Sequence, residues 1–285
     1  MTRIREKETE TNLVDYTLLV GPPATTLEAF ENPKLRQFPA SLENIEWLEF
    51  LGYGEEGHVY LANIGDYGRV AVKVFWHTYR AGELVLGMPM WNTFPFKTES
   101  QVVDLNQKIA WAMSEVKKTP GQNIQIRRGP KTRDHAKANV LAFSQESWES
   151  LNVSANESTK LSPAPPFPRC YGWAKIDNSQ LPKVHPPMPQ GPKLVGWSWV
   201  IVYEYVPAAA PDITIAQTFF DYFYDIGFIV AFRPENWRGG KLVDINDIVS
   251  PLVRNWFPEG VCSRNATKLD WTIHNDNCPD RSIVK

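Results

Sequence analysis

The sequence has few cysteines, no long apolar run and no excess of charge of one sign, and each shortage excludes a class of protein. Its three cysteines are widely spaced and form no C-x-x-C pair, which argues against a zinc site and a disulfide framework. A formal net charge of −2 gives no electrostatic reason to expect direct nucleic-acid binding. The longest apolar run, 194–206, is too short to span a membrane and contains Glu204.

What remains is the composition of a globular protein. The 285 residues are 43% hydrophobic and 12% aromatic, enough to bury a substantial core. The first residues, 1–7, are charged and lack the apolar core of a secretion signal. We therefore expect an intracellular protein, nuclear or cytoplasmic, that does not enter membranes.

A glycine-rich motif is the most informative stretch. Gly52, Gly54 and Gly57 form a G-x-G-x-x-G that is followed by Val59. The dinucleotide-binding version of this motif passes from a strand into a helix. Here residues 58–64 are apolar and β-prone, so the glycines are expected to join two antiparallel strands.

Lys73 lies in the next predicted strand, which begins at Arg69. Alternation places the three valines of residues 70–75 on one face and Ala71, Lys73 and Phe75 on the other. A lysine between apolar neighbours needs an opposite charge. Since glycines let backbone N–H groups approach an anion, the pattern predicts a phosphate beside Lys73. The alternative is a glycine-rich hairpin with a lysine that extends to solvent.

A helix is predicted after this strand, capped by Thr98 or Ser100 and ending near Lys118, because apolar residues recur there at helical spacing. Two glutamates on this helix, Glu99 and Glu115, are candidates to pair with Lys73. Each is alternatively a solvated surface charge.

The other segments differ in character. Residues 1–40 are polar and proline-punctuated, and we expect a partly disordered extension without a core of its own. Residues 119–166 indicate a long, largely mobile insertion, with a short helix around 134–148 and a basic stretch that is either a solvated loop or a docking or nuclear-import surface. Two further strands are predicted at 169–176 and 197–207, and an aromatic helix follows at 213–228.

A second informative stretch begins at Arg233. Asn236 lies in a loop, a Gly-Gly hairpin follows, and Asp244 ends a short apolar strand. This order would place an amide beside a carboxylate, and both are oxygen ligands suited to a phosphate-bound Mg²⁺. The alternative is a glycine hairpin with an Asx turn.

Taken together, these motifs resemble the protein-kinase fold. The glycine motif is similar to the kinase glycine-rich loop, and Val70-Ala71-Val72-Lys73 is similar to the strand with the ATP-binding lysine. Arg233-Pro234-Glu235-Asn236 resembles the end of the catalytic loop, and Leu242-Val243-Asp244 resembles the metal-binding strand.

The chain also resembles a fungal kinase-like family named after a kinetochore Sim-complex (Fta-like) subunit. The shared segments are Leu48-Glu49-Phe50-Leu51-Gly52, Pro95-Phe96 with Glu99, Arg169-Cys170-Tyr171-Gly172, and Asn236 to Asp244. This resemblance implies kinetochore association and a protein partner.

The kinase resemblance implies an α+β, two-lobed fold. Residues 41–206 would form an N-terminal lobe with a five-stranded antiparallel sheet and one helix, and 207–285 a reduced helical C-terminal lobe. The implied cofactors are ATP and Mg. The implied nucleotide-binding residues are Gly52, Gly54, Gly57, Val59, Ala71, Lys73, Glu99, Glu204 and Val206. The implied metal ligands are Asn236 and Asp244.

Several departures from the kinase pattern bear on catalysis. Ala231 stands where the resemblance would place the catalytic aspartate, and Ile245 and Asn246 replace the two residues that follow the metal-binding aspartate. We therefore expect a pseudokinase-type binding or scaffold protein. One alternative is an active atypical kinase that uses another carboxylate, from Asp225, Asp247 or Glu235, and acts on a protein or small molecule. Another is an interaction module with an empty cleft.

Overall fold

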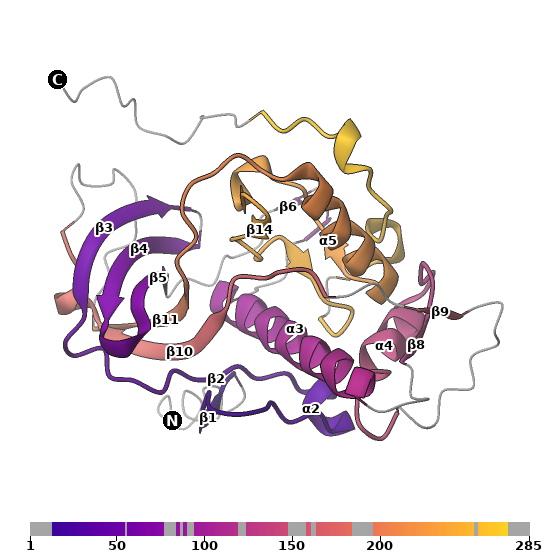
Figure 1. The fold of residues 1–285 in the computed structure, drawn as a ribbon, viewed down its shortest axis with the longest axis horizontal. Helices are drawn as coiled ribbons and strands as arrows, with labels where there is room; N and C mark the ends of the chain where they lie inside the picture. Colours follow the sequence, from indigo (N-terminus) through magenta and orange to yellow (C-terminus); the bar gives the residue numbers. More distant parts are fainter. Residues whose placement is uncertain are drawn as a thin grey trace.

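The protein has an α+β fold, with a seven-stranded mixed sheet and four α-helices among the residues that the computed structural model describes (Figure 1). Those residues are 13–54, 56–76, 84–85, 88–89, 94–118, 124–147, 158–160, 164–183, 196–253 and 256–272. Within these ranges, no helix combines the length and the apolar character needed to cross a membrane.

The main sheet has the order β1-β2-β10-β11-β5-β4-β3. Every neighbouring pair from β10 to β3 is antiparallel. This part consists of five eight-residue strands, which are β3 (Glu46–Tyr53), β4 (Gly57–Ile64), β5 (Gly68–Phe75), β10 (Cys170–Asp177) and β11 (Trp197–Glu204). All five correspond to strands predicted from the sequence, and alternation was the argument for β5.

The predicted sheet was nevertheless wrong in size and type, because two further strands complete it. β1 (Asp15–Leu18) and β2 (Arg36–Gln37) come from the segment expected to be an extension, and they pair in parallel. Strands of two and four residues between prolines are too short for alternation to reveal. Phe30 and Leu35 of the same segment are fully buried, so it contributes to the core.

Helix α3 (Pro95–Lys118) is the longest element and lies against the sheet (Figure 1). Its predicted start at Thr98 or Ser100 was wrong, because Pro95 begins the helix, where a missing N–H costs nothing. The predicted apolar stripe is buried, and Glu99 continues it by one turn toward the N-terminus.

Three shorter helices complete the set, which are α2 (Leu27–Glu31), α4 (Arg133–Leu141) and α5 (Ile213–Ile226). Helix α5 ends two residues before its predicted end, since Gly227 adopts a left-handed conformation with φ of 97°. Helix α4 ends at Leu141 and not near Trp148.

The described part of the predicted insertion packs into the core. Its strand β8 (Gln125–Arg127) pairs with β9 (Ser158–Lys160), and both β8 and α4 contact α5. Ile126 and Val140 are fully buried. The expectation of a largely mobile insertion is therefore wrong for 124–147, while 119–123, 148–157 and 161–163 lie outside the described residues.

Hydrophobic residues cover both faces of the main sheet. One face packs with α3, α5 and the N-terminal segment in a core that includes Phe75 and Ile201. The opposite face carries Val70, Val72 and Val74, as alternation predicted, under a cover from residues 38–45. Lys73, between two of these valines, therefore points to the α3 side.

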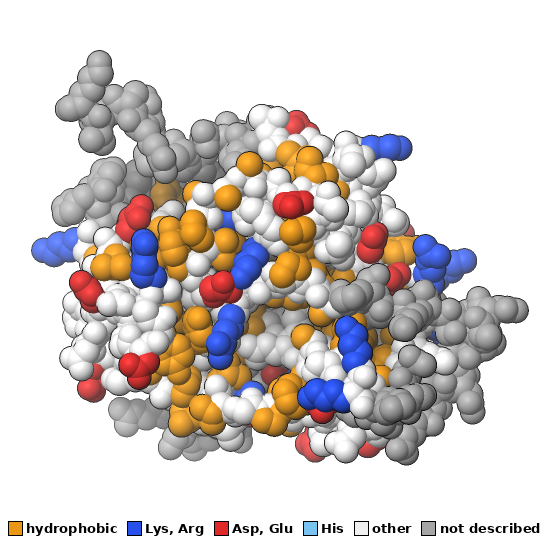
Figure 2. All heavy atoms as spheres, in the orientation of Figure 1, with side chains coloured by type: hydrophobic (Ala, Val, Ile, Leu, Met, Phe, Trp, Pro, Cys, Tyr) orange, Lys and Arg blue, Asp and Glu red, His pale blue; other side chains and the backbone are white. Residues whose placement is uncertain are grey.

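Short antiparallel pairs of strands follow α5. They are formed by β12 (Ile229–Val230) with β15 (Ile248–Val249) and by β13 (Trp237–Arg238) with β14 (Lys241–Leu242). A further pair consists of β6 (Leu84–Val85) and β7 (Met88–Pro89). Figure 2 shows lysine, arginine and acidic side chains scattered over one face, so the described residues there form no large area of one charge.

Candidate functional site

Lys73 is the centre of the candidate site. It lies on β5, between β4 and β11, opposite Val59 on one neighbour and Ile201 on the other. Only 7% of Lys73 is exposed, since α3 packs against this face of the sheet. A buried ammonium requires nearby carboxylates, and the fold supplies three.

The three carboxylates come from distant parts of the chain. The Nζ atom of Lys73 donates to Glu99 Oε2 at 2.7 Å and to Asp244 Oδ1 at 2.9 Å, and it lies 4.0 Å from Glu56 Oε2. We call these four residues the Lys73 cluster. Glu99 belongs to α3, Asp244 follows β14, and Glu56 lies in the glycine-rich loop.

The structure distinguishes between the two candidate glutamates of the long helix. Glu99 pairs with Lys73, and its other oxygen, Oε1, accepts a hydrogen bond from the hydroxyl of Tyr203 on β11. Glu115 pairs with Lys118 at the surface. Tyr203 was not among the predicted site residues, although it lies two positions from Ile201 and therefore on the same face of β11.

The electrostatics of the cluster follow from burial and close charges. Burial would lower the pKa of Lys73, but Asp244, Glu99 and Glu56 together raise it. Burial raises the pKa of Glu99 against the opposing effect of Lys73. Burial would also raise the pKa of Asp244, but Lys73 lowers it. The ammonium and Asp244 are therefore charged at neutral pH.

Glu56 differs from the other two acids. Burial, with Asp244 and Glu99 nearby, raises its pKa to about 8 against the effect of Lys73. The cluster therefore has three carboxyl groups and one ammonium, and the positive charge of Lys73 does not balance three negative charges. The neighbouring Glu55 lies outside the described residues.

The glycine-rich loop joins β3 to β4 and lies at the end of β5. The backbone N–H of Trp76 donates to the Glu56 carbonyl at 2.9 Å, and that of Gly54 donates to the Gly57 carbonyl at 3.0 Å. A Cβ on Gly57 would lie 1.9 Å from the carbonyl oxygen of Val74, whereas one on Gly54 would meet nothing within 4 Å. The loop thus requires glycine at position 57 for close approach to β5.

Asn236 lies beside the cluster and does not contact Lys73. Its Nδ2 donates to Asp247 Oδ2 at 3.0 Å, and Arg233 Nε lies 3.0 Å from the same oxygen. Burial and Asp244 raise the pKa of Asp247 against the effect of Arg233. The Gly-Gly hairpin forms as predicted, with residues 239–240 between β13 and β14.

Glu204 and Val206 lie at the end of β11. The Glu204 backbone N–H donates to the carbonyl of Arg169, and its two carboxylate oxygens accept from Lys241 Nζ, each at 2.6 Å. Glu204 therefore holds the β13–β14 hairpin against the sheet. Val206 and Ala71 are half-buried.

The three carboxylates around Lys73 form a set of oxygen donors that suits a divalent cation. Oxygens of Glu56, Glu99 and Asp244 lie within 4.8 Å of one another, and carboxylate oxygens are preferred ligands of Mg²⁺. The side chain of Asp244 is 42% exposed, so it can contact an incoming ligand. Asn236 can offer only its amide oxygen, because its nitrogen is used by Asp247.

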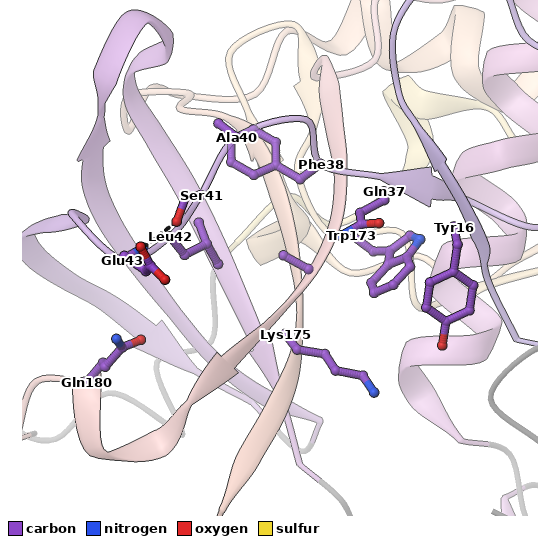
Figure 3. Close-up of a pocket in the computed structure, with 11 residues that line it drawn as sticks. Tyr16, Gln37, Phe38, Ala40, Ser41, Leu42, Glu43, Trp173, Lys175 and Gln180 are labelled. Atoms are coloured by element: carbon purple, nitrogen blue, oxygen red, sulfur yellow. Dashed lines mark hydrogen bonds between the residues drawn. The ribbon is translucent and has the colours of Figure 1, made fainter. Parts of the chain in front are cut away.

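A separate hollow lies at the other end of the sheet. It has a volume of about 370 Å³ and lies between β10 and residues 37–43. Figure 3 shows Tyr16 and Trp173 at one end of it and Glu43 and Gln180 at the other. None of the residues that line it belongs to the Lys73 cluster.

Comparison with known proteins gives no further guide to this site. The chain matches no known protein family and shows no significant similarity to a curated protein. Any function must therefore be argued from the geometry.

Proposed function

We propose that the chain is a pseudokinase-type protein that binds a magnesium-nucleotide at the Lys73 cluster and works by binding a protein partner. The observation that carries this proposal is the convergence of Lys73 with Glu99 and Asp244, which are 26 and 171 positions away in the sequence. A glycine-rich loop ends beside them. These are the parts that kinase-like proteins use to hold phosphates and Mg²⁺.

Each part has a chemical role in the proposed binding. Lys73 would contact the phosphates, and Glu99 holds its ammonium in place. Asp244, together with the amide oxygen of Asn236, would ligate the magnesium ion, which neutralises phosphate charge. Val59 and Ala71 share the face of Lys73 in neighbouring strands and offer apolar contact for a base.

Ala231 is the reason to propose binding without turnover. A methyl side chain cannot accept a proton from an acceptor hydroxyl, and base catalysis typically contributes about 10²–10⁴-fold to a rate. Its backbone N–H is hydrogen-bonded to the carbonyl of Asp247, so Ala231 occupies a defined place at the end of β12.

A thermal-unfolding titration with ATP and Mg²⁺ tests the proposal. At ten times the dissociation constant, binding adds about 1.4 kcal/mol of stability, which raises Tm by about 2–4 °C. We expect this shift in the wild type and in Lys118→Ala, which removes a surface lysine of α3. Lys73→Ala should show none. An equal shift in Lys73→Ala, or no wild-type shift at about 10 mM nucleotide, would overturn the proposal.

Phosphoryl transfer is a second candidate function, favoured by the position of Asp247. The β12–β15 pairing places Asp247 opposite Ala231, and its carboxylate bonds to Asn236. A carboxylate is thus supplied from the strand facing Ala231. In this reaction an acceptor hydroxyl oxygen bonds to the γ-phosphorus, the bond to the β-phosphate oxygen breaks, ADP departs with the electron pair, and Asp247 takes the hydroxyl proton.

Incubation with labelled ATP and a cell extract separates the two candidates. Transfer that is lost in both Asp244→Ala and Asp247→Asn would favour the enzyme. Transfer that persists in Asp247→Asn would refute the role of that residue, and no transfer by the wild type would leave binding as the function.

A further inference from the structure

Glu56 is the member of the Lys73 cluster that comes from the glycine-rich loop, and hydrogen bonds to Trp76 hold the backbone of this loop in place. Its side chain is 27% exposed, and its Oε2 atom lies 4.0 Å from Lys73 Nζ. Lys73 already has two closer partners, Glu99 at 2.7 Å and Asp244 at 2.9 Å. The lysine therefore does not need Glu56 for its own charge.

The backbone of the loop is bonded to the strands on either side of this position. Trp76 donates to the carbonyls of both Glu56 and Gly54, through its backbone N–H at 2.9 Å and its indole Nε1 at 3.4 Å. Gly57 pairs with Phe75, in close contact with the Val74 carbonyl. With the backbone fixed at these points, the Glu56 side chain leaves the cluster only by rotating outward or by opening of the loop.

The place that Glu56 occupies is the one an anionic ligand of Lys73 requires. Glu99 is 1% exposed and belongs to α3, and Asp244 lies in the segment after β14, so neither of these acids comes from the loop. Glu56 approaches from the glycine-rich loop, the side from which loop amides would face a phosphate.

We infer that the Glu56 side chain is an internal substitute for a nucleotide phosphate at Lys73 and inhibits nucleotide binding until it leaves. The inference rests on the proposed function, since it concerns the regulation of that same site. The Lys73 ammonium has three N–H donors, and two of them are used by Glu99 and Asp244, so one remains for either Glu56 or a phosphate. Removing the Glu56 side chain therefore frees the place beside the ammonium and leaves Lys73, Glu99 and Asp244 intact.

Equilibrium binding of Mg-ATP and of Mg-ADP to the full chain tests this inference. We expect Glu56→Ala to bind each nucleotide at least about tenfold more tightly than the wild type. Glu31→Ala, which removes an exposed carboxylate on α2, should bind like the wild type. The gain in nucleotide affinity should disappear in Glu56→Ala/Lys73→Met, because a phosphate in the place of the Glu56 side chain would then have no ammonium to contact.

The outcomes separate the inference from the proposed function. Equal affinities for wild type and Glu56→Ala would overturn the inference and leave the proposed function standing, as would a gain that survives loss of Lys73 or appears equally in Glu31→Ala. Binding by neither protein would overturn both. Binding by Glu56→Ala alone would support the inference and contradict nucleotide binding by the unmodified chain.

Discussion

Replacing Lys73 by methionine should destabilise the fold strongly, because it removes the buried positive charge. Methionine keeps most of the side-chain volume, so the loss of stability reports on the charge and not on a cavity. The Glu99 side chain is 1% exposed and would lose its charged partner at 2.7 Å. The attraction across that distance is about 6 kcal/mol at an effective dielectric constant of about 20. The desolvation cost of each buried ion is several kcal/mol, so breaking such a pair typically costs about 3–5 kcal/mol.

Urea unfolding of a double-mutant cycle measures this interaction. Lys73→Met alone should lose about 3–5 kcal/mol of unfolding free energy at pH 7. Combining it with Glu99→Gln should recover about 2–3 kcal/mol relative to the sum of the single changes. Lys118→Met should lose less than about 1 kcal/mol, since its pair with Glu115 is exposed.

The pH dependence of Lys73→Met supplies a second check. Without the ammonium, burial still raises the pKa of Glu99, so the folded variant holds the proton more tightly than the unfolded chain. The destabilisation should therefore shrink as the pH falls from 7 toward 5. A loss below about 1 kcal/mol at pH 7, or a coupling free energy near zero, would refute the buried ion pair.

Three other changes test the surroundings of the site. Gly57→Ala should cost about 1–3 kcal/mol in urea unfolding, because its methyl group would overlap a β5 carbonyl, while Gly54→Ala should cost little. Burial lowers the pKa of His58 to about 4, so the unfolded chain binds this proton more tightly and stability should fall as the pH drops from about 6.5 to 4. His58→Phe should remove about 2 kcal/mol of that fall; an unchanged pH profile would refute the assignment. Lys108→Met removes the buried partner of Asp104 and should lower the unfolding free energy by about 3 kcal/mol. Because Lys108 also donates to the Ala29 carbonyl of α2, the change should speed amide exchange in α2. Exchange in α2 like that of the wild type would contradict this role.

Regular patterns in the sequence were sufficient to predict the long elements. The valines of β5 alternate at positions 70, 72 and 74, and this placed Lys73 on the face opposite to them, which in the structure is the α3 side. The apolar stripe of α3 predicted its buried side. Helical spacing alone did not separate the two glutamates, because Glu99 lies three positions before Val102 and Glu115 three positions after Ala112.

The missed features depend on contacts that have no local pattern. β2 has two residues, and its place in the sheet is set by pairing with Trp173, far along the chain. The approach of Glu56 to Lys73 depends on how the loop folds over the end of β5. Asp247 meets Ala231 only because β12 and β15 pair. Such features follow from tertiary packing, which periodicity does not describe.

Equilibrium dialysis with labelled ATP and Mg²⁺ tests the central claim most directly. We expect binding to one site per chain in the wild type, tighter binding in Glu56→Ala, and loss of binding in Lys73→Met while Lys118→Met retains it. Absence of binding in both wild type and Glu56→Ala, or binding that persists unchanged in a folded Lys73→Met, would contradict a nucleotide site at Lys73.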